Sequence, residues 1–551
     1  MLLIVGWDGA AWPLADRFMA AGAMPTLAAL AERGRTFDVE STVPPVTFPA
    51  WTTFMTAAGP GMHGITDFTA RRAGSYGVKF LNSTHRRLPT IWRQMAAAGC
   101  RVGVYAMPAT YPAERVCEIE VCGFDTPLGA SQARGFCHPP SLADTIVARH
   151  GALAVEAVPQ TRIGPGWHER TLERLLANVA LRTRIVSELL RERSFDVFAV
   201  HYMESDTVAH HFWQFHDESS PRHRGEGPAA AIEEVYRALD RGLAELMAAA
   251  GDDCTVLLLS DHGCGGASDR AIAWNRVLAD AGFLSFARVA AGARLAGALR
   301  RTALSAVPQP WQAPLLGAMP RLAARLESAW RLTGIDWSAT SAYSEELPYH
   351  PSIWLNLAGR EPAGIVAPHE AEHVIGRLSQ ALLALRDPFD GGAVVRRVRR
   401  REEVCAGPYA HQVPDLVLEL REPDGYSYCA IASRGGQERA WLRRLRSGET
   451  SGAKGNATSG MHRPTGIGLL CGPPISAASS RERCTLADCG VTALAMAGVA
   501  PSPFMEGRAL AQPGSTLESG QAWEDCAADV AYSAEEEREV EQRLRALGYL
   551  P

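Results

Sequence analysis

Acidic and imidazole side chains that could bind a metal follow three widely separated segments of the 551-residue chain. Asp8 follows the first segment, Asp206 and His210 follow the second, and Asp261 and His262 follow the third. Carboxylates and imidazoles are the usual ligands of zinc at catalytic sites, where three protein groups leave one coordination position open. The sequence therefore supplies enough ligands for more than one such site.

Two sets of three ligands can be drawn from these residues and one further histidine. Asp206 and His210 are four positions apart, which places them on one face if that stretch is helical, and His462 could complete the set. The second set consists of Asp8, Asp261 and His262, with Thr47 at its open position.

Thr47 is the residue whose type and position suit a nucleophile. The sequence from Phe48 to Met55 predicts a helix with Pro49 in its first turn, where a missing N–H has no cost. Thr47 would then stand at a helix N-terminus, where unpaired N–H groups and the helix dipole favour an alkoxide or a phosphoryl oxygen. The structural alternative is an ordinary N-cap threonine without a chemical role.

Each proposed ligand also has a structural explanation. Asp8 could cap a turn and Asp261 the next helix, while His262 and His462 could be hydrogen-bonded loop residues. The metal-binding interpretation is favoured because several of these residues directly follow strand-like segments along the chain.

The elements expected to position these residues alternate between buried strands and helices. Short apolar runs at 2–7, 195–200 and 255–259 are typical of buried strands, and the second and third follow helical patterns at 169–191 and 229–249. This alternation predicts an α/β fold with a parallel sheet. Ligands of such sheets bind beyond the carboxyl ends of the strands, where the candidate residues lie.

Composition excludes several classes of function. The net charge of −5 gives no basic field for binding a nucleic-acid polymer. The twelve cysteines form no C-x-x-C pair, so we expect reduced, buried thiols. The N-terminus lacks a signal peptide and no apolar run approaches the roughly 18 residues of a membrane span, which together predict a cytoplasmic protein.

Six short motifs occur in order along the chain: Gly6-Trp7-Asp8-Gly9, Thr47-Phe48-Pro49, His63-Gly64-Ile65, Asp206-x-x-x-His210, Ser260-Asp261-His262-Gly263 and Gly460-Met461-His462-Arg463-Pro464. As a set, they resemble the motifs of the type I phosphodiesterase/nucleotide pyrophosphatase branch of the alkaline phosphatase superfamily, and the resemblance spans residues 1 to about 515. The terminal residues 543–549 are similar to the tail of bacterial members described as predicted phosphohydrolases or phosphomutases.

The resemblance implies an alkaline-phosphatase-like α/β core, with a mainly parallel sheet flanked by helices, and two divalent metal ions. It implies zinc, although Asp/His sets also accept manganese. Thr47 would be the nucleophile, forming a phosphothreonine intermediate with a small phosphorylated substrate, either a phosphodiester or a nucleotide pyrophosphate. One metal would take Asp206, His210 and His462, and the other Asp8, Asp261, His262 and the Thr47 oxygen. His63 would shape the loop behind the nucleophile.

The residues expected to bind the substrate depart from the family pattern. An asparagine that contacts the phosphoryl oxygen in nucleotide pyrophosphatases falls on Phe68 here, so Lys454, Arg463 or a backbone N–H near Phe48 must replace it. The aromatic residues Phe48, Trp51 and Phe68 favour a diester, because its second ester group needs an apolar wall. A phosphomonoesterase or phosphomutase would need extra cations for a dianion. A third reading is a metal-stabilised binding protein that has lost catalysis.

The domain organisation follows from changes in composition. We expect a catalytic core over residues 1–515, interrupted at 285–336 by Ala/Leu/Arg-rich helical stretches that form a cap or lid, or alternatively an oligomer contact. Residues 516–551 read as a linker and a charged surface helix with a capping box at Ser533. The sequence leaves the oligomeric state open.

Overall fold

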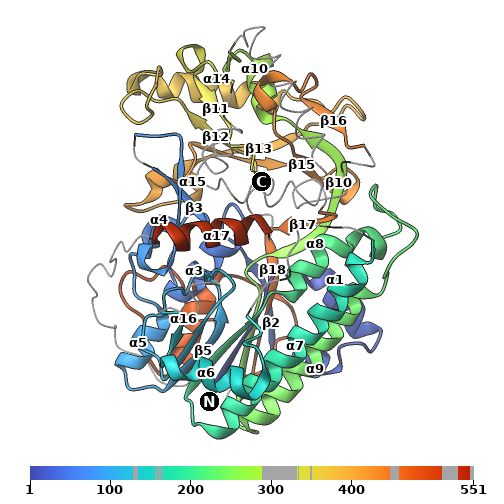
Figure 1. The fold of residues 1–551 in the computed structure, drawn as a ribbon, viewed down its shortest axis with the longest axis vertical. Coiled ribbons are helices and arrows are strands. Elements are labelled where there is room, and N and C mark those ends of the chain that lie inside the picture. The colour runs from blue at the N-terminus through green and yellow to red at the C-terminus, as the bar shows by residue number, and fades with distance from the viewer. Residues whose placement is uncertain are drawn as a thin grey trace.

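A nine-stranded sheet organises the lobe that carries the N-terminus (Figure 1). The computed structural model describes residues 1–546 except 73, 128–134, 156–157, 159–162, 164, 288–331, 333, 348–349, 447–448, 450–457, 474 and 512–531. In spatial order the strands are β19 (Glu482–Thr485), β2 (Arg35–Glu40), β18 (Thr465–Cys471), β9 (Thr255–Leu259), β1 (Leu2–Trp7), β8 (Val197–Tyr202), β5 (Val102–Met107), β6 (Ile119–Cys122) and β7 (Cys137–His138).

The centre of this sheet is parallel. Strand β1 pairs in parallel with both β8 and β9, and β5 pairs in parallel with β8 and β6. Strand β18 runs antiparallel to β9 and β2, and β7 runs antiparallel to β6. The predicted mainly parallel α/β fold is thus confirmed, and β1 and β9 have the predicted bounds.

Helices cover both faces of the sheet because both faces are apolar. Side chains alternate along a strand, so Leu3 and Val5 of β1 enter one core and Leu2 and Ile4 the other. The first face is covered by α1 (Trp12–Ala20), α2 (Pro25–Arg33), α7 (Trp167–Glu192), α8 (Glu204–His216) and α9 (Ala231–Ala250), with α6 (Pro140–His150) at its margin. The second is covered by α3 (Thr47–Thr56), α5 (Ile91–Ala97) and α16 (Leu486–Met496).

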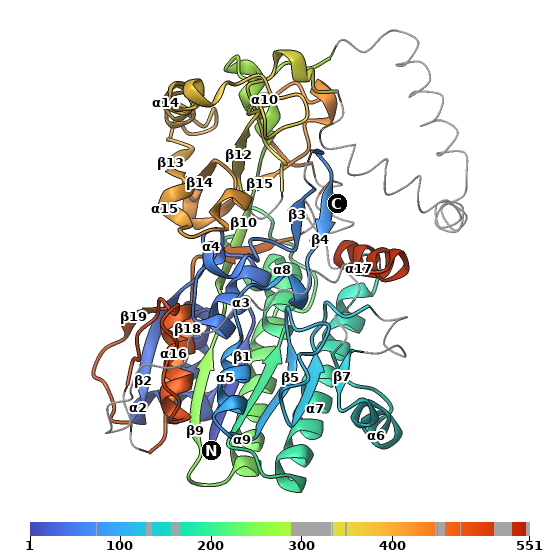
Figure 2. The ribbon, with the colours of Figure 1, turned by 90° about the vertical axis from the view of Figure 1, so that its left-hand side faces the viewer.

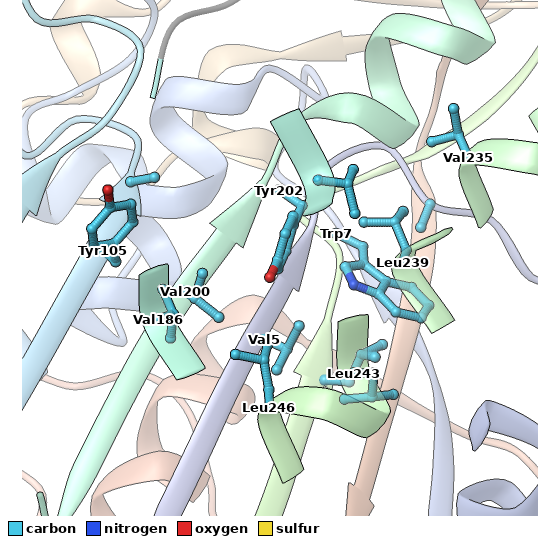
Figure 3. Close-up of a cluster of buried hydrophobic side chains, with 14 of the residues drawn as sticks. Val5, Trp7, Tyr105, Val186, Val200, Tyr202, Val235, Leu239, Leu243 and Leu246 are labelled. Carbon is cyan, nitrogen blue, oxygen red and sulfur yellow. The ribbon is translucent and has the colours of Figure 1, made fainter. Parts of the chain in front are cut away.

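On the first face, side chains of the strands pack between side chains of the covering helices (Figure 3). Trp7 of β1 is fully buried and belongs to the same cluster as Leu239 and Leu243 of α9. Tyr202 of β8 donates or accepts a hydrogen bond of 2.8 Å with Thr183 of α7. This packing positions the ends of β1 and β8. Two of the candidate ligand segments follow these ends directly.

A second lobe lies beyond the carboxyl edge of the core sheet (Figure 2). Strand β10 (Gly263–Ile272) leads into it and pairs with β15 (Ser427–Ala430), β16 (Leu442–Arg444) and β17 (Gly460–Arg463). A separate sheet has the order β11 (Ala342–Tyr343), β12 (Ser352–Leu355), β14 (Leu416–Leu420) and β13 (Val395–Arg400).

The shorter elements connect the lobes or cover their edges. The second lobe also contains α10 (Trp274–Asp280), α14 (Ala371–Leu383) and α15 (Arg401–Val404), and a small hairpin pairs β3 (Thr69–Arg71) with β4 (Val78–Phe80). The others are α4 (Pro60–His63), η1 (Ser83–His85), η3 (Trp337–Ala339), η4 (Pro368–Glu370), η5 (Ala410–Gln412), η6 (Pro423–Gly425) and η7 (Arg434–Gly436).

The C-terminal helix α17 (Ala534–Ala546) docks on the core through its apolar residues. Its predicted capping box is present: Ser533 Oγ accepts from the Glu536 N–H at 3.2 Å, and Glu536 accepts from the Ser533 N–H at 2.8 Å. Val540 and Leu544 are each only 2% exposed. The helix is therefore part of the packed structure on the side of α3 and α16.

The predictions on domain division, cysteines and membrane spans can be compared with the structure only over the described residues. Most of the 285–336 insertion and the 516–531 linker lie outside the described residues, so the domain division stays a prediction. The eleven described cysteines are all free, as expected. Within the described ranges, no helix combines the length and apolar character that a bilayer crossing requires.

Candidate metal centre

The turn after β1 brings the first acid to the carboxyl edge of the sheet. Asp8 is buried, and the following Gly9 has a φ of +64°, a left-handed conformation that glycine adopts without strain. A Cβ on Gly9 would lie 3.0 Å from Oδ1 of Asp206. The Gly9 N–H also donates to Oδ1 of Asp261 at 3.2 Å. Glycine at this position therefore allows acids from three segments to converge.

Helix α8 and strand β17 supply the first set of candidate ligands. Oδ1 of Asp206 lies 3.1 Å from Nε2 of His210, as the four-residue spacing on a helix predicts. Nε2 of His462 lies 3.0 Å from the same His210 nitrogen and 3.5 Å from the Asp206 oxygen. All three side chains are nearly inaccessible to solvent, so three donor atoms converge on one small volume.

The second set lies at the ends of β1 and β9. Nε2 of His262 lies 3.6 Å from Oδ1 of Asp8 and 3.3 Å from Oδ2 of Asp261. Both carboxylate oxygens are buried without a hydrogen-bond partner among the described residues. A buried, unpartnered carboxylate oxygen is costly unless a cation compensates it.

His262 joins the two sets. Its donor atom also lies within 4.8 Å of those of Asp206 and His462, and its ring stacks on that of His462 with centroids 3.7 Å apart. The two candidate sets therefore adjoin each other.

Backbone carbonyls fix the orientation of the three imidazoles. Nδ1 of His210 lies 2.7 Å from the Gly460 carbonyl oxygen, and Nδ1 of His462 lies 2.8 Å from that of Pro45. Nδ1 of His262 lies 3.0 Å from the carbonyl oxygen of Gly263. A ring that donates from Nδ1 leaves Nε2 as an acceptor, which is the arrangement typical of histidine metal ligands.

The electrostatics of the site also suit a cation. Burial, together with the neighbouring Asp8, raises the pKa of Asp261 well above its ordinary value. Burial and the adjacent His462 lower the pKa of His262 to about 4, so this imidazole is neutral near pH 7. Ionised carboxylates and neutral imidazoles are the metal-binding forms, and a bound divalent cation would favour ionisation of Asp261. The residues present therefore fit divalent metal ions.

The side chain of Thr47 faces the second set and does not cap its helix. Val46 occupies the N-cap position of α3, Thr47 is the first helical residue, and the cap makes no side-chain hydrogen bond. Oγ of Thr47 lies 3.5 Å from Nε2 of His262. Thr47 is therefore not the N-cap residue of α3, and its hydroxyl lies beside a candidate ligand.

Two contacts that support Asp8 were not predicted from the sequence, one from His201 and one from Trp51, which was assigned to an apolar wall for the substrate. Nε2 of His201 lies 2.9 Å from Oδ2 of Asp8, and the Trp51 indole N–H donates to the same oxygen at 3.1 Å. Gly6 makes room for Trp51, since a Cβ there would lie 2.6 Å from the indole. A histidine within an otherwise apolar buried strand was the available signal for His201, but its partner could not be read from the sequence.

The predicted substrate-binding residues do not gather as one group. Phe48 and Phe68 pack with ring centroids 4.5 Å apart and are buried. The Arg463 guanidinium hydrogen-bonds Glu422, Ser427 and the Gly425 carbonyl oxygen, so it is held by the second lobe. Lys454 lies outside the described residues.

His63 is the last residue of α4, and its ring nitrogens contact nearby residues of its own part of the chain. It is fully buried, its Nε2 lies 3.1 Å from Oγ1 of Thr53, and its Nδ1 accepts the Ile65 N–H at 3.1 Å. Burial lowers its pKa to about 3, so the ring is neutral.

The fold and the two adjoining ligand sets define an α/β protein with a candidate site for divalent metal ions. Residues 2–432 match the family model described as type I phosphodiesterase / nucleotide pyrophosphatase. The chain belongs to this family of phosphoryl hydrolases, which confirms the resemblance inferred from the six motifs.

Two solved structures of one enzyme share this fold. Phosphonoacetate hydrolase from Sinorhizobium meliloti 1021, in complex with phosphonoformate, is 17% identical with a TM-score of 0.52, over 90% of this chain and 95% of that chain. The same values hold for that enzyme in complex with phosphonoacetate. Murine ectonucleotide pyrophosphatase / phosphodiesterase 5 is 14% identical with a TM-score of 0.47, over 93% of this chain and 97% of that chain. No curated protein matches the chain.

Proposed function

We propose that the protein is a two-metal phosphoric ester hydrolase acting on phosphodiesters or nucleotide pyrophosphates, with Thr47 as nucleophile. The observation that carries this proposal is the convergence of six buried Asp and His side chains beside the Thr47 hydroxyl, which lies 3.5 Å from His262. Membership of a phosphoryl hydrolase family supports it.

The metal ligands in this proposal are the six buried side chains and the threonine oxygen. When bound, two divalent cations would neutralise charge on the phosphoryl oxygens and make oxygen nucleophiles available near neutral pH. Zinc suits this Asp/His donor set best, and manganese is the second choice. One site takes Asp206, His210 and His462, and the other takes Asp8, Asp261, His262 and Thr47.

Thr47 carries out the first chemical step. Its Oγ loses its proton and attacks phosphorus, the bond from phosphorus to the leaving oxygen breaks, and the leaving group departs and takes up a proton. The phosphothreonine that forms keeps the second substituent of the substrate on phosphorus. Water then cleaves the bond between phosphorus and Thr47 Oγ, which releases a phosphomonoester or phosphate and restores the hydroxyl. The first N–H groups of a helix lack intrahelical acceptors, so those of Thr47 and Phe48 could stabilise a phosphoryl oxygen.

The surroundings of the nucleophile support a diester substrate. Phe48 follows Thr47 directly and packs on Phe68, and these two buried rings place no charged side chain on that side of the nucleophile. Arg463, which was proposed to replace the family's asparagine, is engaged by Glu422 and Ser427, so these contacts direct this cation away from the phosphoryl group. A phosphomonoesterase or phosphomutase would need such cations, because it binds a doubly charged group.

The test compares two chromogenic substrates on the purified protein. We expect bis(p-nitrophenyl) phosphate to be hydrolysed in preference to p-nitrophenyl phosphate, in a reaction that requires added zinc or manganese. A preference for the monoester would support the monoesterase or phosphomutase alternative. Two bound metals without turnover of either substrate would support a binding protein.

We also propose a cytoplasmic location for the protein, which cell fractionation would test.

A further inference from the structure

A buried ion pair lies behind the turn that carries Asp206. Arg182, in the middle of α7, and Glu204, the first residue of α8, are each 1% exposed. The guanidinium donates to both oxygens of Glu204, at 2.7 and 3.0 Å. It also donates to the carbonyl oxygens of Ala154, at 2.8 Å, and His201, at 3.2 Å. One side chain thus ties three segments together.

The residues from His201 to Asp206 link this pair to both candidate metal sets. The His201 ring contacts Asp8 at 2.9 Å, and the Tyr202 carbonyl accepts the Asp8 N–H at 2.9 Å. The Ser205 hydroxyl donates to the Asp8 carbonyl oxygen at 2.6 Å. Asp206 then enters the first set, so the turn contacts Asp8 on one side and presents Asp206 on the other.

Arg182 contacts this turn at two points. It holds the backbone of His201, whose ring orients Asp8, and the side chain of Glu204, two residues before Asp206. A lysine in its place would keep the charge but could not bridge a carboxylate and two carbonyl groups in one plane. The contacts of Arg182 are therefore better suited to orienting the turn from His201 to Asp206 than to compensating the charge of Glu204 alone.

We infer that Arg182, through Glu204 and the His201 backbone, is a positioning residue that sets the relative placement of the two metal-ligand sets. This inference rests on the proposed two-metal function. Groups that hydrogen-bond metal ligands directly contribute about 10- to 100-fold to metal affinity in other proteins. Arg182 acts through Glu204 and the His201 backbone, so we expect a contribution at the lower end of this range, about 10-fold.

The experiment measures zinc affinity of the metal-free, full-length protein by competition with a chromophoric chelator. Arg182→Met should weaken zinc binding about 10-fold, and Arg182→Lys should also weaken it. Arg101→Met is the matched control. Arg101 forms an exposed ion pair with Asp196, with N–O distances of 3.2 and 3.3 Å, at the opposite end of β8. Breaking this pair should leave zinc affinity unchanged.

A double variant separates positioning from stability. Arg182→Met alone leaves Glu204 buried without its partner, which destabilises the fold, whereas Arg182→Met with Glu204→Gln removes both charges. We expect the double variant to regain resistance to urea but not zinc affinity. Recovery of both, or wild-type zinc affinity in Arg182→Met, would overturn the inference. Failure of the wild-type protein to bind either zinc or manganese would instead refute the proposed function itself.

Discussion

Oγ of Thr47 lies 3.5 Å from Nε2 of His262, the histidine whose donor atom is near both Asp8 and Asp206. The proposed nucleophile is therefore beside the residue that joins the two ligand sets. Helix α3 delivers the threonine and the end of β9 delivers the histidine, so the contact depends on packing between segments far apart in sequence.

Replacing the nucleophile should remove turnover without removing metal. For Thr47→Ala we expect a loss of diester hydrolysis of at least about 1,000-fold, because the attacking oxygen is gone. Six Asp and His ligands remain, so metal content measured by atomic absorption should stay close to wild type. Thr47→Ser keeps the hydroxyl and should retain measurable activity. An active Thr47→Ala protein would exclude the assigned role.

Removing His462 should lower metal content and activity together. Its Nε2 is 3.0 Å from that of His210 and 3.5 Å from Asp206, so the first set would lose one of three donors. We expect His462→Ala to retain less metal per chain after dialysis. His369→Ala, at an exposed position in the second lobe, is the control. Wild-type metal stoichiometry in His462→Ala would remove this residue from the site.

His201 should affect metal binding although it is not a proposed ligand. Its ring contacts the Asp8 oxygen at 2.9 Å and thereby orients the other Asp8 oxygen toward His262. We expect His201→Ala to weaken metal binding about 10- to 100-fold, measured by calorimetric titration of the metal-free protein. His201→Gln, which can still donate to Asp8, should be less impaired. Equal affinities in both variants and the wild type would show that this contact is dispensable.

Glu120 should make stability depend on pH away from the metal centre. Burial raises its pKa to about 7, against the opposing effect of Arg86. A carboxyl whose pKa is raised on folding favours the folded state below its ordinary pKa, near 4.5, and that contribution is lost as the pH rises through 7. The shift corresponds to about 3 kcal/mol.

Glu120→Gln should therefore be more stable than wild type at pH 8, by up to about 3 kcal/mol, and similar to it at pH 4.5. The amide oxygen can still accept the Glu114 N–H, which Glu120 accepts at 2.8 Å. Urea unfolding of both proteins at the two pH values measures the difference. A stability difference that does not change with pH would contradict the raised pKa.

The sequence by itself determined the local elements and the order of the candidate residues. The apolar runs of β1 and β9 have the predicted bounds because a strand buried on both faces must be apolar along its whole length. Asp206 and His210 share one face of α8 because the helical repeat sets that spacing. The family was also readable, because its motifs are short and local.

Only the tertiary structure decided which atoms meet. The partners of Asp8, namely His201 and Trp51, come from β8 and α3, and nothing local in the sequence links them. Arg463 follows a proposed ligand directly, yet its guanidinium turns to Glu422 in the second lobe, since neighbouring residues of β17 point to opposite sides. Thr47 could have capped its helix, and the choice between that role and facing His262 depended on where α3 packs against the end of β9.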